Sequence, residues 1–224
     1  MTVLLSLASR LRLAKLHLIV DARRAEGDLA EFARQMIRVG VDVLQLRDAS
    51  LTPGQRVSAL RALRQAAQGT RALVLSDDVD AASQAGIDGV HVRRGQDTVE
   101  VKARLHPWAL AGRSAHDAAE LAAAMTDPGT DYLLVGKTVW DSAARELPPF
   151  ALPVRNKPWF AVGGITADNI DEAVRRGTRR VCVSRAITWA SEPVEAAAEL
   201  AGVLRRAWAR DPAGDAYSMA AYSD

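Results

Sequence analysis

The sequence predicts an α/β fold and, within that class, a TIM (β/α)8 barrel: a single domain with an extra helix at its N-terminus. Short apolar runs rich in β-branched residues alternate with alanine-rich amphipathic stretches along the 224 residues. About eight such units follow one another at roughly 25-residue spacing, which is typical of a closed parallel barrel. The alternative, an open doubly wound sheet, usually carries a G-x-G-x-x-G turn after its first strand. Residues 20–24 read Val-Asp-Ala-Arg-Arg instead.

The eight predicted strands are short apolar runs bounded by glycine or polar residues. Each alternates with a stretch in which apolar residues recur at helical spacing. The strands are predicted over residues 16–20, 41–46, 72–75, 88–92, 109–112, 132–135, 158–162 and 180–183.

The predicted helices lie between these strands. The first one is bounded by Asp28, a suitable N-cap, and by Gly40, a suitable C-terminal stop. The unit at residues 141–157 is the weakest, because its three prolines leave room for only a short helix. Helices are predicted over residues 28–40, 53–67, 79–85, 98–105, 116–125, 168–176 and 193–210.

Both ends of the chain lie outside this repeating plan. Residues 1–14 are predicted to form the N-terminal helix and residues 15–211 the barrel. Residues 212–224 are small, polar and aperiodic, which predicts a disordered C-terminal tail. The apolar stretch at the N-terminus is followed by Arg10 and Arg12, where a signal peptide would carry small residues for cleavage.

Composition and charge exclude several classes of protein. The net charge is only +2, which argues against binding nucleic acid through bulk charge. No apolar run reaches the ~18 residues that span a bilayer, so no membrane association is expected. The only cysteine is Cys182, so no intrachain disulfide can form, and a cytoplasmic location is expected. Aromatic residues make up 5%, and the core is therefore expected to consist of Ala, Val, Leu and Ile.

The C-terminal ends of the strands are where a barrel places its functional side chains. The turn at Gly163 and Gly164 follows a predicted strand and precedes a helix, so its backbone can approach an anion closely. Ser184 and Arg185 end the neighbouring strand. The two loops together predict a phosphate site.

Two aspartates follow adjacent predicted strands. Asp77 and Asp97 would suit Mg²⁺, which is commonly held by few carboxylates together with substrate phosphates and water. The alternative makes Asp77 a helix N-cap and Asp97 a solvated loop residue. His116 is a candidate acid or base by type, or else a helix cap beside Asp117.

Several segments carry a resemblance to a known family. They are Gln45-Leu46-Arg47-Asp48, Asp77, Gly-Arg-Ser-Ala-His at 112–116, Lys-Pro-Trp-Phe-Ala-Val-Gly-Gly-Ile at 157–165 and Arg-Ala-Ile-Thr at 185–188. In these segments the chain resembles the thiamine phosphate synthase family, whose superfamily also contains the TenI-type thiazole tautomerases. The resemblance extends from about residue 16 to residue 208, with the segments in the family's order.

This resemblance implies an activity. The family joins hydroxymethylpyrimidine pyrophosphate to thiazole phosphate, which makes thiamine phosphate and releases pyrophosphate. The implied mechanism is dissociative: pyrophosphate leaves with the help of Mg²⁺, and the thiazole nitrogen captures the pyrimidine cation. Such chemistry needs positioning and charge neutralisation more than a strong base. The partners implied are these two small molecules, with Mg²⁺ as the cofactor.

The resemblance also implies roles for individual residues. Gln45, Arg47 and Ser114 would hold the pyrimidine pyrophosphate, and Asp77 and Asp97 would hold Mg²⁺. The thiazole phosphate would be bound largely by backbone amides. The implied substrate-binding residues are Gln45, Arg47, Ser76, Ser114, Arg145, Gly163, Gly164, Ser184 and Arg185, and the implied catalytic residues are Arg47, Ser114 and Lys137.

The chain departs from the family's pattern mainly around the pyrophosphate. A family lysine is Ala49, a family asparagine is Ser76, and Arg93-Arg94 is inserted before the loop of Asp97. The loop after the sixth strand lacks the family's threonines and lysine and reads Lys-Thr-Val-Trp-Asp-Ser-Ala-Ala-Arg over residues 137–145.

Three hypotheses follow from these departures. The first is a synthase in which Arg93, Arg94, Lys137 and Arg145 replace the missing cations. The second is a TenI-like tautomerase that uses Lys137 as its base, and the third is a non-catalytic barrel that binds a phosphate ligand.

Overall fold

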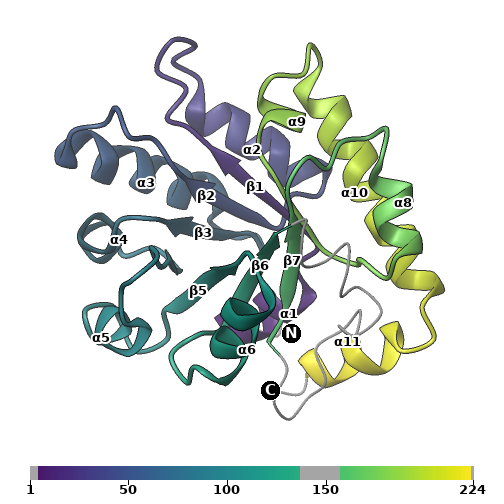
Figure 1. Cartoon of the computed structure of the whole chain (residues 1–224). Helices are drawn as coiled ribbons and strands as arrows, with labels where there is room; N and C mark the ends of the chain where they lie inside the picture. Colours follow the sequence, from purple (N-terminus) through teal and green to yellow (C-terminus); the bar gives the residue numbers. More distant parts are fainter. Residues whose placement is uncertain (1–4, 137–156, 223–224) are drawn as a thin grey trace.

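Eight parallel strands pair in sequence order, and β8 pairs with β1 to close the barrel, so the predicted fold class is confirmed. The computed structural model describes residues 5–136 and 157–222 (Figure 1). The strands are β1 Leu16–Val20, β2 Val43–Leu46, β3 Leu73–Ser76, β4 Gly89–His91, β5 Leu110–Ala115, β6 Tyr132–Gly136, β7 Trp159–Val162 and β8 Val181–Val183.

Helices surround the strands (Figure 1). They are α1 Leu7–Leu13, α2 Leu29–Val39, α3 Pro53–Ala67, α4 Val79–Ala85, α5 Thr98–Ala103, α6 Ala118–Thr126, α8 Ile170–Arg175, α9 Arg185–Thr188, α10 Pro193–Arg210 and α11 Gly214–Tyr222. Local sequence explains many of their ends. A capping box joins Thr52 to Gln55 at the start of α3, and Gly40, at φ 116°, ends α2. None of the described helices is both long and apolar enough to cross a membrane.

The strands separate two apolar layers because successive side chains point to opposite faces. Inside the barrel, Val43, Leu75, Tyr132 and Phe160 pack together. Leu11 of α1 joins this inner cluster, so the predicted N-terminal helix packs against the barrel interior. The outer layer, between strands and helices, is formed mainly by the aliphatic residues that the composition predicts.

The predicted disorder of residues 212–224 is wrong for the part that the structure describes, because Gly214–Tyr222 forms helix α11. Tertiary contacts hold this helix. The Trp208 indole N–H donates to Ser218 Oγ at 3.1 Å, and the Trp208 and Tyr217 rings meet edge to face at 5.7 Å. Ala221 is fully buried. The local pattern is too weak to predict these contacts with α10.

A strand end and a short helix also differ from the prediction. The fifth strand continues to Ala115, three residues beyond the predicted end at Gly112, because it pairs with β6 along Gly112–Ala115. Ser114 is therefore held on a strand. The short helix α9 was not predicted. The short helix expected within 141–157 falls almost entirely outside the described residues.

Candidate active site

A cavity of about 750 Å³ opens at the C-terminal end of the barrel. Its walls come from the ends of β1, β2 and β4–β7, from the loops after β3 and β4, and from the start of α6. The main lining residues are Ile19, Gln45, Arg47, Asp77, His91, Arg93, Arg94, Ser114, His116, Glu120, Leu134 and Val162. Five of the predicted residues meet here: Gln45, Arg47, Asp77, Ser114 and the acid–base candidate His116.

Gln45 and Arg47 occupy alternate positions at the end of β2 and so point to the same side of the strand. Gln45 is only 1% exposed, and its Oε1 makes no hydrogen bond of normal geometry with the described residues, although its side chain interacts with the buried imidazole of His17. A buried amide oxygen without a partner is unfavourable unless a ligand or water satisfies it. Arg47 is exposed and forms no ion pair with a described carboxylate, so its guanidinium is available to an anion.

Ser114 is oriented by a half-buried histidine. His91 Nε2 lies 2.9 Å from Ser114 Oγ, and His91 Nδ1 lies 3.3 Å from Tyr132 Oη. Burial, aided by the charge of Arg47, lowers the pKa of His91 to about 4, so the imidazole is neutral near pH 7. A neutral imidazole has one donor and one acceptor, which suits a hydroxyl on each side.

Gly112 makes room for this arrangement. A Cβ at Gly112 would lie 2.0 Å from Cζ of Tyr132, so a side chain there would displace the ring. Sequence reasoning identified Ser114 but not the support that His91 and Tyr132 give it. His91 at a strand end was the only available signal.

Asp77 lies between two arginines. Its Oδ1 is 3.6 Å from Arg56 Nη1, and its Oδ2 is 3.5 Å from Arg93 Nη2. Arg56 comes from α3, is only 9% exposed and was not predicted as a site residue. The inserted Arg93 thus reaches the mouth of the cavity beside Asp77, as the first hypothesis requires.

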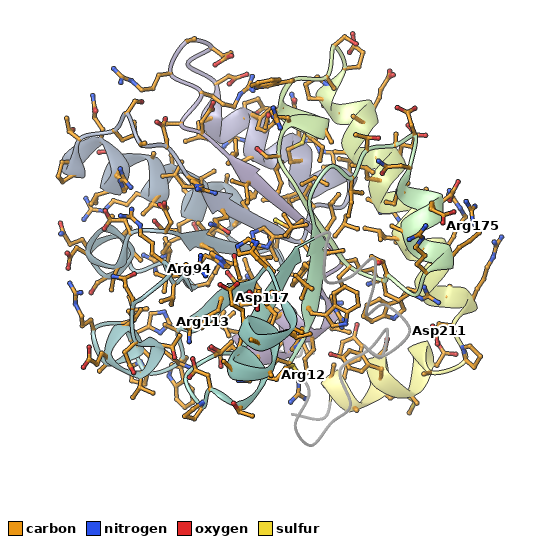
Figure 2. All side chains as sticks on the ribbon, in the orientation of Figure 1. Arg12, Arg94, Arg113, Asp117, Arg175 and Asp211 are labelled. Carbon is orange, nitrogen blue, oxygen red and sulfur yellow. The ribbon has the colours of Figure 1, made fainter. Side chains whose placement is uncertain are left out.

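Arg94 also lines the cavity, and it pairs with Glu120 of α6. In Figure 2 it extends from the loop after β4 on the side of the barrel where Asp117 and Arg113 are labelled. Both inserted arginines therefore contribute positive charge to the cavity wall. Each is partly neutralised by one carboxylate.

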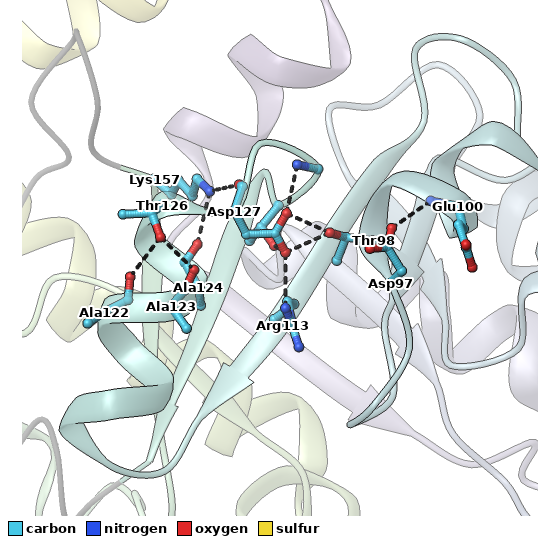
Figure 3. A network of polar contacts seen from close by, with 12 residues as sticks. Asp97, Thr98, Glu100, Arg113, Ala122, Ala123, Ala124, Thr126, Asp127 and Lys157 are labelled. Atoms are coloured by element: carbon cyan, nitrogen blue, oxygen red, sulfur yellow. Dashed lines mark hydrogen bonds and ion pairs between the residues drawn. The ribbon is translucent and has the colours of Figure 1, made fainter.

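Two residues predicted for the pyrophosphate and metal part of the site lie outside the cavity. Asp97 caps α5: its Oδ1 accepts the Glu100 backbone N–H at 2.9 Å (Figure 3). Ser76 Oγ accepts the Asp78 N–H at 3.0 Å. Neither residue lines the cavity. The alternative roles are wrong as well, because Asp78 rather than Asp77 caps α4, and Asp97 is a helix cap rather than a solvated loop residue.

Few side chains in the cavity could coordinate a metal ion, because Asp97 lies outside it. Within residues 5–136 and 157–222 no cluster of three or more His, Cys, Asp or Glu side chains could hold an ion. One atom does fit: Asp77 Oδ1 is buried and accepts no hydrogen bond from the described residues. Because Mg²⁺ takes one or two carboxylates and completes its shell with phosphates and water, Asp77 is a suitable single ligand.

A partly buried network braces the wall that carries Arg113. Asp127 accepts hydrogen bonds from Thr98 Oγ1 at 2.6 Å and from Arg113 Nη1 at 3.0 Å (Figure 3). Burial alone would raise the pKa of Asp127, but these bonds, with those from Gly129 N and Thr130 Oγ1, lower it to about 2. The network ties α5 and β5 to the loop after α6.

The predicted phosphate loops lie after β7 and β8. Gly163 and Gly164 have φ values of 117° and 65°, and a Cβ on Gly164 would meet no atom within 4 Å. Ser184 precedes α9, and the Arg185 guanidinium lies 5.2 Å from the centre of the Trp189 ring. None of these residues lines the 750 Å³ cavity. Lys137 and Arg145 lie outside the described residues.

Comparisons with known proteins bear on this site. Residues 16–187 match the family described as thiamine monophosphate synthase. The thiamine-phosphate synthase of Saccharopolyspora erythraea is 40% identical over 209 residues, which cover 86% of this chain and 93% of that protein. The thiamine-phosphate synthase of Thermobifida fusca is 38% identical over 208 residues, covering 87% and 94%.

A solved structure shares the fold. The structure of thiamine phosphate pyrophosphorylase from Pyrococcus furiosus aligns with a TM-score of 0.71 and 23% identity, covering 90% of this chain and 99% of that one. The family match and the curated relatives, which are transferases, confirm the resemblance seen in the sequence. This chain belongs to the thiamine monophosphate synthase family.

Proposed function

We propose that this chain joins hydroxymethylpyrimidine pyrophosphate to thiazole phosphate, with release of pyrophosphate and with Mg²⁺ as cofactor. The observation that carries the proposal is the convergence of Gln45, Arg47, Asp77, Arg93 and Ser114 on one cavity at the C-terminal end of the barrel. Its volume of about 750 Å³ is in the range of small-molecule sites.

The cavity supports the breaking of a bond to pyrophosphate. As the C–O bond to the pyrimidine methylene breaks, its electron pair stays with the leaving oxygen, and the thiazole nitrogen forms the new C–N bond. Arg47 and Arg93 would neutralise the charge that grows on the leaving group, where preorganised cations are most effective. Gln45 would orient the pyrimidine through its unsatisfied Oε1. Ser114, fixed by His91, would donate to an anionic oxygen.

Asp77 would hold Mg²⁺ in this scheme. Its Oδ1, which pairs with Arg56 but accepts no hydrogen bond from the described residues, would supply one oxygen ligand, and Arg56 and Arg93 keep the carboxylate in place from both sides. When bound, the ion would add further neutralisation of the pyrophosphate. Asp97 has no part in this assignment, because its carboxylate caps α5.

The thiazole phosphate half of the proposal rests on Gly163, Gly164, Ser184 and Arg185. The open backbone at Gly164 and the position of the two loops after β7 and β8 favour this assignment. A cytoplasmic location belongs to the same proposal, since the one cysteine, Cys182, is buried and unpaired.

The test is an assay of purified protein with both substrates and Mg²⁺. Thiamine phosphate should form, and both Arg47→Gln and Arg93→Gln should raise KM for the pyrimidine pyrophosphate by about tenfold, since each removes a charge-assisted contact. Arg38→Gln on α2 is the matched control, because Arg38 is exposed and lies outside the cavity lining.

The outcomes separate the three hypotheses. No thiamine phosphate at high enzyme concentration would overturn the proposed synthase. Isomerisation of a thiazole phosphate that is lost in Lys137→Ala would then point to the tautomerase. Binding of thiazole phosphate without turnover in either assay would point to the non-catalytic barrel.

A further inference from the structure

A second cavity, of about 530 Å³, lies at the opposite end of the barrel from the candidate active site. Its walls come from α1, from the second half of α3 with the loop that follows it, and from Asp88 just before β4. These segments adjoin the N-terminal ends of the strands. We call it the basic cavity, defined by Arg10, Arg61, Arg64, Gln65, Gln68 and Gly69.

Two arginines of α3 supply most of its hydrogen-bond donors. Arg61 Nη2 donates to the Gln84 carbonyl at 3.2 Å, and Arg64 Nη1 donates to the Ala85 carbonyl at 3.2 Å. Each guanidinium carries five N–H groups, so most of them remain available after one such bond. Neither arginine forms an ion pair with a carboxylate in the described part of the chain.

The acceptors around the cavity are largely engaged. Asp88 Oδ2 accepts the Val74 N–H at 2.7 Å, and Asp88 Oδ1 lies 4.0 Å from Arg10 Nη1. The Ala67 carbonyl at the end of α3 accepts from both N and Oγ1 of Thr70. The one carboxylate of the wall is therefore engaged, whereas Arg61 and Arg64 keep donors available.

The C-terminus of a helix carries partial negative charge, so it normally disfavours the binding of an anion nearby. The end of α3 lines the cavity, and there the Gln65 carbonyl accepts the Gln68 N–H and the Ala67 carbonyl accepts from Thr70. At the end of the neighbouring helix α4, Arg61 and Arg64 contact the last carbonyls. The two guanidinium groups therefore offset the partial negative charge of the α4 carbonyls, and both arginines line the cavity. An acceptor-rich, negatively charged ligand matches this wall.

We propose that the basic cavity binds a small phosphate-bearing anion. Guanidinium groups bind phosphate oxygens in a fork geometry, and Arg61 and Arg64 lie three residues apart, on one face of α3. The Gln65 and Gln68 amides would add neutral donors, and Gly69 leaves open space at the rim. The basic cavity is separate from the candidate active site. The proposal that it binds an anion therefore does not depend on the proposed reaction.

The test is a titration followed by ¹H–¹⁵N NMR, with inorganic phosphate as one probe and glycerol 3-phosphate as the other. The backbone amides of Gly69 and Thr70 report on the basic cavity, and that of Ser114 reports on the active site. Saturable shifts at Gly69 and Thr70 are expected. The tighter-binding probe tells whether the free ion or a phosphate monoester is preferred.

Variants connect the shifts to the arginines. Arg61→Gln/Arg64→Gln should weaken binding at Gly69 and Thr70 by at least about tenfold, whereas Arg38→Gln, an exposed arginine of α2, should leave it unchanged. Because the double variant also removes two contacts to α4, Gln68→Glu provides a second test. It keeps both contacts and places a carboxylate in the cavity wall, where it should compete with the anion.

Two results would overturn the proposal. One is the lack of saturable shifts at Gly69 and Thr70 with either probe. The other is unchanged affinity at these amides in both the double variant and Gln68→Glu, provided that circular dichroism shows the two variants to be folded.

Discussion

The Asp127 network offers a prediction whose size follows from the structure. The Asp127 side chain is 14% exposed and accepts hydrogen bonds from Thr98, Gly129, Thr130 and Arg113. Its pKa falls from the ordinary 3.8 to about 2. A shift of about two units corresponds to about 2.5 kcal/mol of stability, or about 1.5–2.5 kcal/mol after allowance for screening by solvent.

The sign of the pH dependence follows from the direction of this shift. Because the pKa of Asp127 is lower in the folded than in the unfolded chain, its contribution is present above about pH 4 and is lost as the pH falls toward 2. Asp127→Asn should therefore unfold more easily than the parent by about 2 kcal/mol at pH 7. The difference between the two proteins should shrink steadily in acid.

Urea unfolding followed by circular dichroism at several pH values measures the difference in the free energy of unfolding at pH 7 and its decrease in acid. Glu199→Gln is the matched control, because Glu199 is an exposed carboxylate on α10 and forms no hydrogen bond or ion pair with the residues that the structure describes. It should change the free energy of unfolding by less than about 0.5 kcal/mol. A difference between Asp127→Asn and the parent that is as large at pH 3 as at pH 7 would refute the electrostatic reasoning.

Three further predictions concern packing and the site. Gly112→Ala would place a Cβ 2.0 Å from Tyr132 Cζ and should cost about 1–3 kcal/mol of stability, measured by thermal unfolding, and an unchanged Tm would contradict the tight packing. Ser114→Ala should lower kcat/KM by about tenfold or more in the synthase assay while Tm stays within a few degrees, and full activity would exclude a role in the reaction. A chain that ends after Asp211 should melt several degrees lower, because Trp208 loses its contacts with α11, and an equal Tm would show that the helix adds no stability.

Much of the fold could be predicted from local signals. The order of strands and helices follows from short apolar runs, helical periodicity and helix stops such as Gly40, each of which acts within a few residues of the chain. Asp28 stands at the predicted N-cap position of α2, but its carboxylate makes no capping hydrogen bond and accepts from Arg23 instead. The strand ends also indicated where Gln45, Arg47 and Ser114 would meet, since a parallel barrel brings its C-terminal strand ends together.

The roles of the aspartates could not be predicted in the same way. An aspartate that follows a strand can cap the next helix or face the cavity, and spacing does not separate the two. In the folded chain the Asp97 side chain caps the start of α5, whereas Asp77 lines the cavity. Likewise, the contact of Arg93 with Asp77 joins residues 16 positions apart, across two strand ends.

The sequence alone determined the barrel, the family and the end of the barrel where the chemistry belongs, because apolar periodicity, capping residues and segment order are local properties. Tertiary structure alone decided that Arg56 and Arg93 flank Asp77, that His91 orients Ser114 and that α11 packs against α10. It also created the basic cavity between α1 and α3. The physical reason is that ion pairs, buried hydrogen bonds and cavities depend on distances between residues far apart in the chain, which are set only when the barrel closes.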